Sequence, residues 1–261
     1  MIMANLFLPR FRGAALAVWR RNTLVWRKLM LPSILINFGE PFLYLLGLGY
    51  GLGLFIGEMM HMPYLTFLAS GILASSAMNT ASFEAMFSVY TRMIPQKTYD
   101  AILATPLEVQ DILAGEMLWC ATKCVISGTA ILIVAALLGA VHDWNALWVP
   151  PVLFLIGLCF SGLGLIMSAL APGYDFFNYY VTLVLTPMFI LSGVFYPVTS
   201  LPVALQSAVQ LLPLAHAVDL IRPLVAGLPL DNVPLHLAVL AGYGAAGYLI
   251  AVRLTRKRLL V

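Results

Sequence analysis

The sequence predicts an all-α membrane protein that forms a single transmembrane domain over residues 1–261. Of its 261 residues, 62% are hydrophobic and only 10% are charged, and the mean hydropathy is +0.95. Soluble domains carry about 25% charged residues, so this composition indicates an integral membrane protein. Six apolar stretches are long enough to cross a bilayer, which takes about 20 residues. They lie at 31–55, 64–89, 112–138, 151–170, 178–195 and 235–254.

The distribution of positive charge predicts the orientation of the spans. Twelve of the 14 Lys and Arg lie before the first span, between the second and third, or after the sixth. These three regions share one side of the membrane. Only Arg222 falls on the opposite side, and Lys123 lies inside a span. Because Lys and Arg accumulate on the cytoplasmic side of membrane proteins, we expect both termini and the loop after the second span in the cytoplasm.

Residues 10–29 have the pattern of an amphipathic helix that lies along the inner leaflet. Apolar side chains gather in one half of the helical wheel and most basic side chains in the other, with Asn22 as an exception in the apolar half. We name this segment the interface helix. Its candidate site residues are Trp19, Arg20, Arg21, Trp26 and Arg27.

Three ionisable side chains lie inside the predicted spans: Glu40, Glu84 and Lys123. Such residues are costly in hydrocarbon, and they usually mark a function or a pair. Glu84 and Lys123 lie on the spans that flank the cytoplasmic loop, so we expect a structural ion pair, with a substrate contact as the alternative. Glu40 is expected to face a cavity or to reach the inner interface. The first span also carries glycines spaced four residues apart, which favour close helix packing in lipid: 47/51, 49/53 and 53/57.

The loop over residues 90–116 is the longest polar stretch between two spans. Residues 97–104 can form about two helical turns with Tyr99, Ile102 and Leu103 on one apolar face. Thr105 then has the pattern of an N-cap, with Pro106 at the first helical position and a glutamate closing a capping box. We expect this short helix to contact something other than lipid. Its candidate site residues are Lys97, Tyr99, Asp100, Ile102, Leu103, Thr105 and Pro106.

Residues 196–227 are apolar, but prolines divide them into pieces of about ten residues, which are too short to cross a bilayer. Such pieces are typical of re-entrant helices, which enter the membrane and return. His216, Asp219 and Arg222 recur there at three-residue spacing, so Asp219 and Arg222 are expected to pair. No nucleophile completes this group as a catalytic site. We interpret it as an outer gate.

The sequence predicts no cofactor or metal site in this chain. Cys120 and Cys124 supply at most two ligands, and we expect them to pack as small side chains. No glycine-rich phosphate loop occurs, so we expect no ATP site in the chain itself. The aromatic residues at 176, 177, 179 and 180 are expected to form a belt at the membrane interface, with stacking on sugar rings as the alternative.

The order of these elements, with LATPL after the short cytoplasmic helix and LSGVFYPVTSLP…LLPLAHAVDLIRPLVAG near the end, resembles the membrane-spanning permease of the type-2 ABC transporter family. The resemblance covers nearly the whole chain and is most specific from Leu191 to Arg222. Within the family, three further stretches are similar to the NodJ-like branch, whose permeases are associated with export of nodulation lipo-oligosaccharides. These stretches are Leu46–Gly53, Phe67–Ala85 and Gln96–Leu107.

The resemblance implies a dimer of two six-span halves in the bacterial inner membrane. Two copies of a separate ATP-binding cassette subunit would carry the ATP and Mg, and residues 97–104 would be the coupling helix that docks on that subunit. The chain would then be an exporter subunit and not an enzyme, with membrane lipids around it and no nucleic-acid partner. An amphipathic lipid- or carbohydrate-linked molecule would move outward. The alternatives are a secondary transporter driven by an ion gradient and a membrane-embedded lipid-modifying enzyme.

Overall fold

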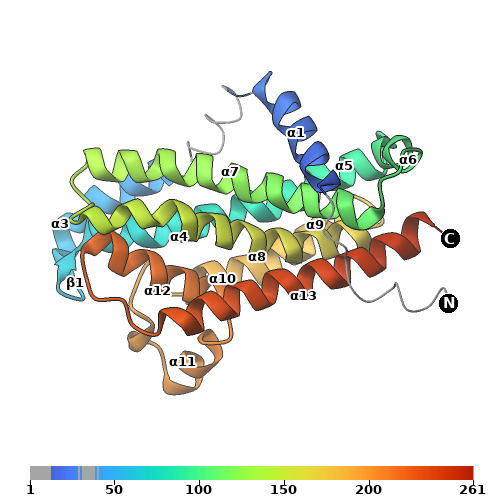
Figure 1. Cartoon of the computed structure of the whole chain (residues 1–261). Helices are drawn as coiled ribbons and strands as arrows, with labels where there is room; N and C mark the ends of the chain where they lie inside the picture. Colours follow the sequence, from blue (N-terminus) through green and yellow to red (C-terminus); the bar gives the residue numbers. More distant parts are fainter. Residues whose placement is uncertain (1–12, 29, 31–38, 40, 261) are drawn as a thin grey trace.

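The computed structural model describes residues 13–28, 30, 39 and 41–260, and over these residues the chain folds as a bundle of long helices (Figure 1). Three of the long helices are α7 (Val109–Leu137), α8 (Val149–Leu170) and α13 (Val233–Leu259). The fourth is continuous but has a π-helical turn, and it consists of α4 (Tyr64–Phe83), η3 (Glu84–Ser88) and α5 (Val89–Met93).

Shorter elements surround this bundle. A helix over Pro41–Ile56 contains η2 (Leu45–Tyr50) and α3 (Gly53–Ile56), and a helix over Phe176–Leu191 contains α9 (Phe176–Tyr180), η5 (Val181–Leu185) and α10 (Thr186–Leu191). The remaining elements are α1 (Ala14–Arg27), β1 (Glu58–Met59), β2 (Met62–Pro63), α6 (Thr98–Leu103), η4 (Trp144–Trp148), η6 (Val198–Ser200), α11 (Val203–Val209) and α12 (Pro213–Ala226).

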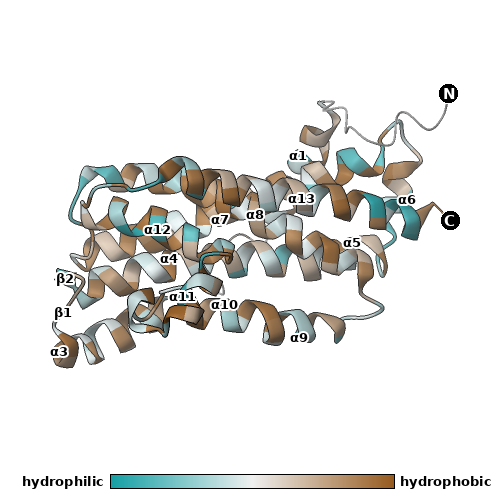
Figure 2. Ribbon diagram, turned by 90° about the horizontal axis from the view of Figure 1, so that it is seen from below, coloured by the Kyte–Doolittle hydropathy of each residue, from teal (hydrophilic) through white to brown (hydrophobic). Residues whose placement is uncertain are grey.

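The helices divide the molecule into two ends. The short helix α6 and the C-terminal end of α13 lie at one end, and α1 crosses α7 near it, whereas α3 and β1 lie at the other (Figure 1). Figure 2 shows hydrophobic residues along the helices and more hydrophilic residues near α6 and the C-terminus. This arrangement agrees with the charge pattern, which assigns the interface helix, the loop after the second span and the C-terminus to one side.

The described residues contain three helices that are long and apolar enough to cross a membrane: α7, the η4–α8 segment Trp144–Leu170, and α13. The α11–α12 pair would make a fourth if it counts as one span, although it bends by 87°. The helices over Pro41–Ile56 and Phe176–Leu191 are apolar but shorter. The chain is therefore a multi-pass, all-α membrane protein, and its division into six spans stays a prediction. Part of the first predicted span, 31–38 and Glu40, lies outside the described residues.

Close helix packing occurs where glycines remove side chains between α8 and α13. A Cβ added at Gly162 would lie 2.8 Å from the carbonyl oxygen of Gly244, and one added at Gly247 would lie 2.6 Å from the Gly162 backbone. Small residues allow this approach because nothing separates the two backbones. The glycines of the first predicted span are packed less closely within this chain. Gly49 contacts Leu65, but Gly47 and Gly51 face open space.

Candidate functional site

Glu116 on α7 is the centre of a polar cluster at the end of the bundle that carries α6. Its side chain is fully buried. The Arg92 guanidinium donates from Nε to Oε1 at 3.0 Å and from Nη2 to Oε2 at 2.7 Å, and Asn22 Nδ2 donates to Oε2 at 2.8 Å. The Tyr99 hydroxyl donates to Oε1 at 3.3 Å. One carboxylate therefore joins α1, α5 and α6 to α7.

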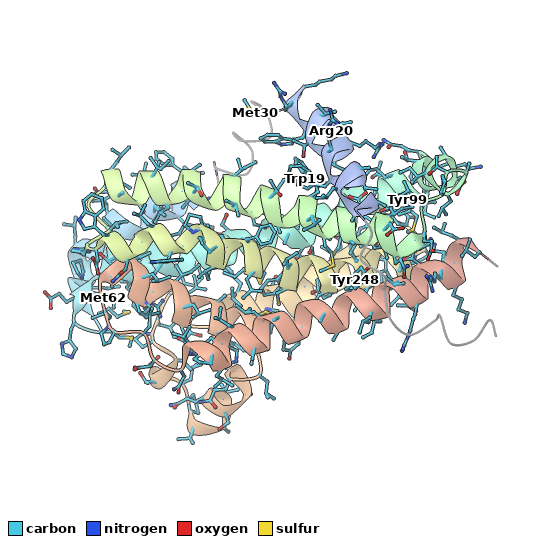
Figure 3. The ribbon with its side chains drawn as sticks, viewed as in Figure 1. Trp19, Arg20, Met30, Met62, Tyr99 and Tyr248 are labelled. Carbon is cyan, nitrogen blue, oxygen red and sulfur yellow. The ribbon has the colours of Figure 1, made fainter. Side chains whose placement is uncertain are left out.

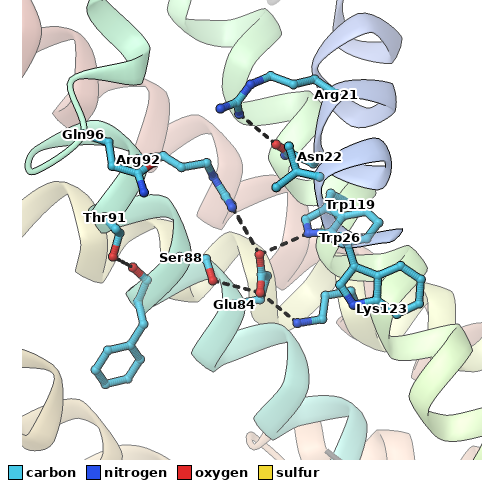
Figure 4. A pocket seen from close by; sticks show the side chains of 12 residues that line it. Arg21, Asn22, Trp26, Glu84, Ser88, Thr91, Arg92, Gln96, Trp119 and Lys123 are labelled. Carbon is cyan, nitrogen blue, oxygen red and sulfur yellow. Dashed lines mark hydrogen bonds and ion pairs between the residues drawn. The ribbon is translucent and has the colours of Figure 1, made fainter. Parts of the chain in front are cut away.

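Glu84 is the second carboxylate of the cluster, and Figure 4 shows the groups that converge on it. Lys123 Nζ lies 2.9 Å from Oε2, which also accepts from the Ser88 hydroxyl at 2.9 Å. Trp119 Nε1 donates to Oε1 at 3.1 Å, and Arg92 Nη2 lies 3.3 Å from the same oxygen. The structure thus contains the ion pair expected between Glu84 and Lys123. Arg92 links this pair to Glu116.

The cluster balances its charge, since two carboxylates face one guanidinium and one ammonium. Buried ions are tolerated when they are paired and their remaining hydrogen bonds are made, and such networks fix one geometry. Among the residues that the structure describes, no group of three or more His, Cys, Asp or Glu is placed to hold a metal ion. The arrangement suits a rigid joint between helices better than a catalytic centre.

The orientation of α6 is the reverse of the one predicted for residues 97–104. Tyr99 is fully buried, and Ile102 and Leu103 pack against the core of the chain. The exposed side carries Lys97, Asp100, Ala101 and Ala104. We expect the apolar face to meet a partner, but in the structure it attaches the short helix to the bundle. The bundle itself supplies the apolar surface that this face covers. Burial, and next the nearby carboxylate, raise the pKa of Tyr99 well above its usual range, so the phenol remains a donor.

The prediction that Thr105 and Pro106 begin the next helix is wrong by three residues. Both lie in an exposed turn, and the Thr105 hydroxyl donates to the Ile102 carbonyl at 2.6 Å. The cap of α7 is Glu108, which forms a reciprocal capping box with Asp111. A carboxylate at the N-cap accepts from the free N–H groups of the first turn as well as a hydroxyl does. The chain therefore contains two successive capping sequences, one that begins at Thr105 and one that begins at Glu108, and α7 uses the second.

Other contacts hold the C-terminal part of α13 against the start of α7 and the end of α8. The Tyr248 hydroxyl donates to the Gln110 carbonyl at 2.9 Å, and Arg256 lies 3.5 Å from Glu108. Arg258 donates to the carbonyls of Ser168 and Ala169 at 3.1 and 3.0 Å. These two carbonyls lie in the last turn of α8, where backbone acceptors have no partner within the helix.

The interface helix is observed as α1, Ala14–Arg27, and it lies against α7 (Figure 3). Gly115 makes the approach possible, because a Cβ there would lie 2.6 Å from the Ala15 carbonyl oxygen. Trp19 Nε1 donates to the Thr122 hydroxyl at 3.0 Å, and Trp26 meets Trp119 edge to face at 5.8 Å. Arg20 and Arg27 are exposed, and Arg21 is partly so. The predicted residues 10–12 and 29 lie outside the described part of the chain, as does Glu40.

At the opposite end, Arg222 on α12 makes contacts that differ from the predicted pair. It donates from Nη2 to the Gly193 carbonyl at 2.6 Å and from Nε to Ser70 Oγ at 3.1 Å, and its guanidinium lies 3.7 Å from the centre of the Phe67 ring. No ion pair joins Arg222 to Asp219 within the described residues. Asp219 is exposed and Arg222 is buried. Carbonyls at the end of α10 and in α4 are nearer partners, because Arg222 points into the bundle.

His216, the third predicted gate residue, bonds instead to the neighbouring helix. Its Nδ1 lies 2.7 Å from Nδ1 of His236 on α13, and its Nε2 donates to the Gln210 carbonyl at 2.8 Å. Because a carbonyl only accepts, Nε2 of His216 carries a proton. In neutral His216, Nδ1 then accepts from His236. The three predicted gate residues thus lie on α12, but no hydrogen bond or ion pair joins them to one another within the described residues.

The predicted aromatic belt is only partly observed. Tyr179 is exposed, but Phe177 and Tyr180 are buried. The Phe177 ring meets Phe87 at 4.9 Å and Tyr90 at 5.5 Å between ring centres. Helical periodicity explains the difference, since Phe177 and Tyr180 are three residues apart and lie on neighbouring positions of one buried helix face.

Sequence reasoning missed Arg92, Glu116 and Asn22 as members of the polar cluster. The sequence pattern places Arg92 only among the cytoplasmic charges. The signal that could have revealed the cluster was Asn22, the one polar residue in the apolar half of α1. A polar group at a buried helical position needs a partner, and Glu116 is that partner.

Comparison with known proteins agrees with this architecture. The chain matches the ABC-2 type transporter family over residues 14–225. It is 49% identical over 245 residues to nodulation protein J of Rhizobium leguminosarum bv. viciae, with 94% of this chain and 95% of the relative covered, and 45% identical to nodulation protein J of Rhizobium meliloti over 94% of each chain. It is 26% identical to the inner membrane transport permease YadH of Escherichia coli over 89% of both chains. The chain therefore belongs to the ABC-2 type transporter family and is a membrane permease subunit.

Proposed function

We propose that this chain is the permease of an ATP-driven exporter in the bacterial inner membrane, with both termini in the cytoplasm. Two copies form the membrane part, and two copies of a separate ATP-binding cassette subunit hold ATP and Mg. The substrate is an amphipathic lipid- or carbohydrate-linked molecule that moves outward. Similarity to nodulation protein J and to an inner membrane transport permease supports this proposal.

The observation that carries the coupling part of the proposal is the contact between α6 and Glu116. Tyr99 attaches the short helix to the same carboxylate that binds α1 and α5. A force applied to α6 therefore reaches α7 through a buried hydrogen bond and not only through a flexible loop. From Glu116 it reaches Glu84 through Arg92.

The exposed side of α6 is then the docking surface for the ATP-binding subunit. It presents Lys97, Asp100, Ala101 and Ala104, with two small residues that allow close approach and two opposite charges. Because Tyr99, Ile102 and Leu103 pack against the rest of the chain, our proposal assigns the contact to the opposite face of α6. The three inner residues hold α6, and the four outer residues meet the partner.

Two measurements test this function. The tagged permease, purified from its native membrane in mild detergent, is expected to bring with it a subunit that hydrolyses MgATP. Substrate-dependent ATP hydrolysis by this complex in vesicles then identifies the exporter. Transport by the permease alone, driven by an ion gradient, would refute the proposal and support the secondary transporter.

The docking surface has its own test. Ala101→Arg places a long side chain on the exposed face of α6, so we expect the ATP-hydrolysing subunit to be lost while the permease stays folded. Ala17→Arg is the matched control, because Ala17 is an exposed alanine on α1 near the same end of the bundle. Equal retention of the subunit by both variants would contradict docking through this face.

A further inference from the structure

A cavity of about 400 Å³ opens between α1, α7 and the η3–α5 segment (Figure 4). It borders the polar cluster, but its outer part is lined by side chains that the cluster does not use. Both basic and apolar residues line it: Arg21 and Lys123 are basic, and Val25, Trp26 and Phe87 are apolar. The cavity is therefore amphipathic.

The charge of the cavity favours an anion. Arg21, Arg92 and Lys123 line it together with one carboxylate, Glu84. Arg92 and Lys123 are neutralised by the cluster. Arg21 bonds only to the neutral amide oxygen of Asn22, at 3.1 Å, and no carboxylate pairs with it in the described part of the chain. Its guanidinium is thus available, and a guanidinium matches the geometry of a phosphate group.

Trp26 supplies an aromatic wall to the cavity. Its indole Nε1–H is buried and makes no hydrogen bond with any described residue. Because this atom is closed to solvent, a ligand in the cavity contacts the ring and not the N–H. Trp26 and Arg21 lie one and a half helical turns apart on α1, and both line the same cavity.

The size and position of the cavity indicate what carries the anion. Binding pockets for organic molecules measure about 300–1,000 Å³, and this cavity falls in that range, whereas a bare phosphate would leave most of it empty. α1 is a basic amphipathic helix with exposed apolar side chains, including Leu24 and Val25, as expected at a lipid headgroup surface. A lipid can place its phosphate beside Arg21 and its acyl chains along Val25 and Phe87.

We propose that this cavity binds the phosphate headgroup of an anionic glycerophospholipid from the leaflet in which α1 lies, with Arg21 as the donor and Trp26 as part of the apolar wall. The proposed lipid site requires neither the ATP-hydrolysing subunits nor the transported molecule. Lipid binding can therefore be measured on the full-length permease alone, purified in detergent.

The test uses a short-chain phosphatidylglycerol as the probe and calorimetry as the readout. Arg21→Gln is expected to weaken binding about tenfold, because a charge-assisted hydrogen bond contributes that much. Arg20→Gln removes the same charge from the neighbouring position, which is exposed and does not line the cavity, and is expected to change binding less than about twofold. Equal weakening in both variants would overturn the proposal, since general attraction to the basic helix would explain it.

A steric pair tests the cavity without a change in charge. Val25→Trp fills the cavity and is expected to abolish binding of phosphatidylglycerol, whereas Leu24→Trp, at an exposed position outside the lining, is expected to leave it intact. Inorganic phosphate is expected not to compete at equal concentration. Equal competition by phosphate would overturn the lipid as ligand, and unchanged binding in Val25→Trp would overturn the cavity as the site.

Discussion

Replacing Glu116 with glutamine removes one charge from the cluster and keeps the shape of the side chain. The wild-type cluster has two negative and two positive groups, so Glu116→Gln leaves a net charge of +1 in a buried place. Removing one partner of a buried pair typically destabilises a protein by about 3–5 kcal/mol. For a chain of this size, about 3 kcal/mol corresponds to a fall of roughly 6–12 °C in Tm.

The assay is thermal unfolding of the detergent-purified permease, followed by the loss of monodisperse protein. Glu58→Gln is the control, since Glu58 is exposed and its neutralisation is expected to change stability by less than about 0.5 kcal/mol. The double variant with Arg92→Gln leaves only the neutral pair of Glu84 and Lys123. We expect it to be more stable than the sum of the single effects by about 2 kcal/mol. Additive effects, or a Glu116→Gln variant as stable as the wild type, would refute the role of the cluster.

Three further predictions concern other contacts. Tyr99→Phe is expected to lower stability by about 1 kcal/mol and to uncouple ATP hydrolysis from transport in the reconstituted complex, because it removes the bond from α6 to Glu116; full coupling would show that the bond is dispensable. Gly162→Ala is expected to lower Tm through a backbone clash, whereas Gly242→Ala, which has open space, is expected to be neutral or stabilising; equal Tm values would contradict the packing. Arg222→Lys loses the guanidinium fork and is expected to destabilise the permease by about 2 kcal/mol in the same unfolding assay. Unchanged stability would show that the contacts of Arg222 with Ser70 and Gly193 do not stabilise the fold.

The sequence predicted much of the fold because the membrane imposes strong rules on composition. Runs of apolar residues were sufficient to predict the long helices. The positions of Lys and Arg were sufficient to predict which segments lie together at the end that carries α6. Helix α7 begins at Val109, three residues after the start that a cap at Thr105 predicts, so the error lay in the cap. Caps are decided by one or two hydrogen bonds, and Thr105 and Glu108 offered nearly equal alternatives.

The candidate site was harder to predict, because its residues come from α1 and from three consecutive helices between residues 84 and 123, and the packing of these helices brings them together. Glu84 and Lys123 stood out as charges inside apolar runs, and they do pair. Glu116 and Arg92 lie in a polar loop region where charge is ordinary, so no local pattern marked them as buried. Periodicity shows that Tyr99, Ile102 and Leu103 share one face of α6, but it does not show whether this face packs on the bundle or on a partner. That outcome depends on the bundle surface next to α6.

The glycine contacts between α8 and α13 have a mechanical consequence. Two backbones that touch without side chains between them have no room to slide or rotate, so this pair behaves as a stiff spine. The irregular hydrogen-bond ladders lie in the π-helical turns η2, η3 and η5, and of these only η3 is held by the polar cluster, so we expect compliance in the other two. Two of these turns lie in the edge helices Pro41–Ile56 and Phe176–Leu191. An opening motion would flex those edges about the spine and leave the spine itself unchanged.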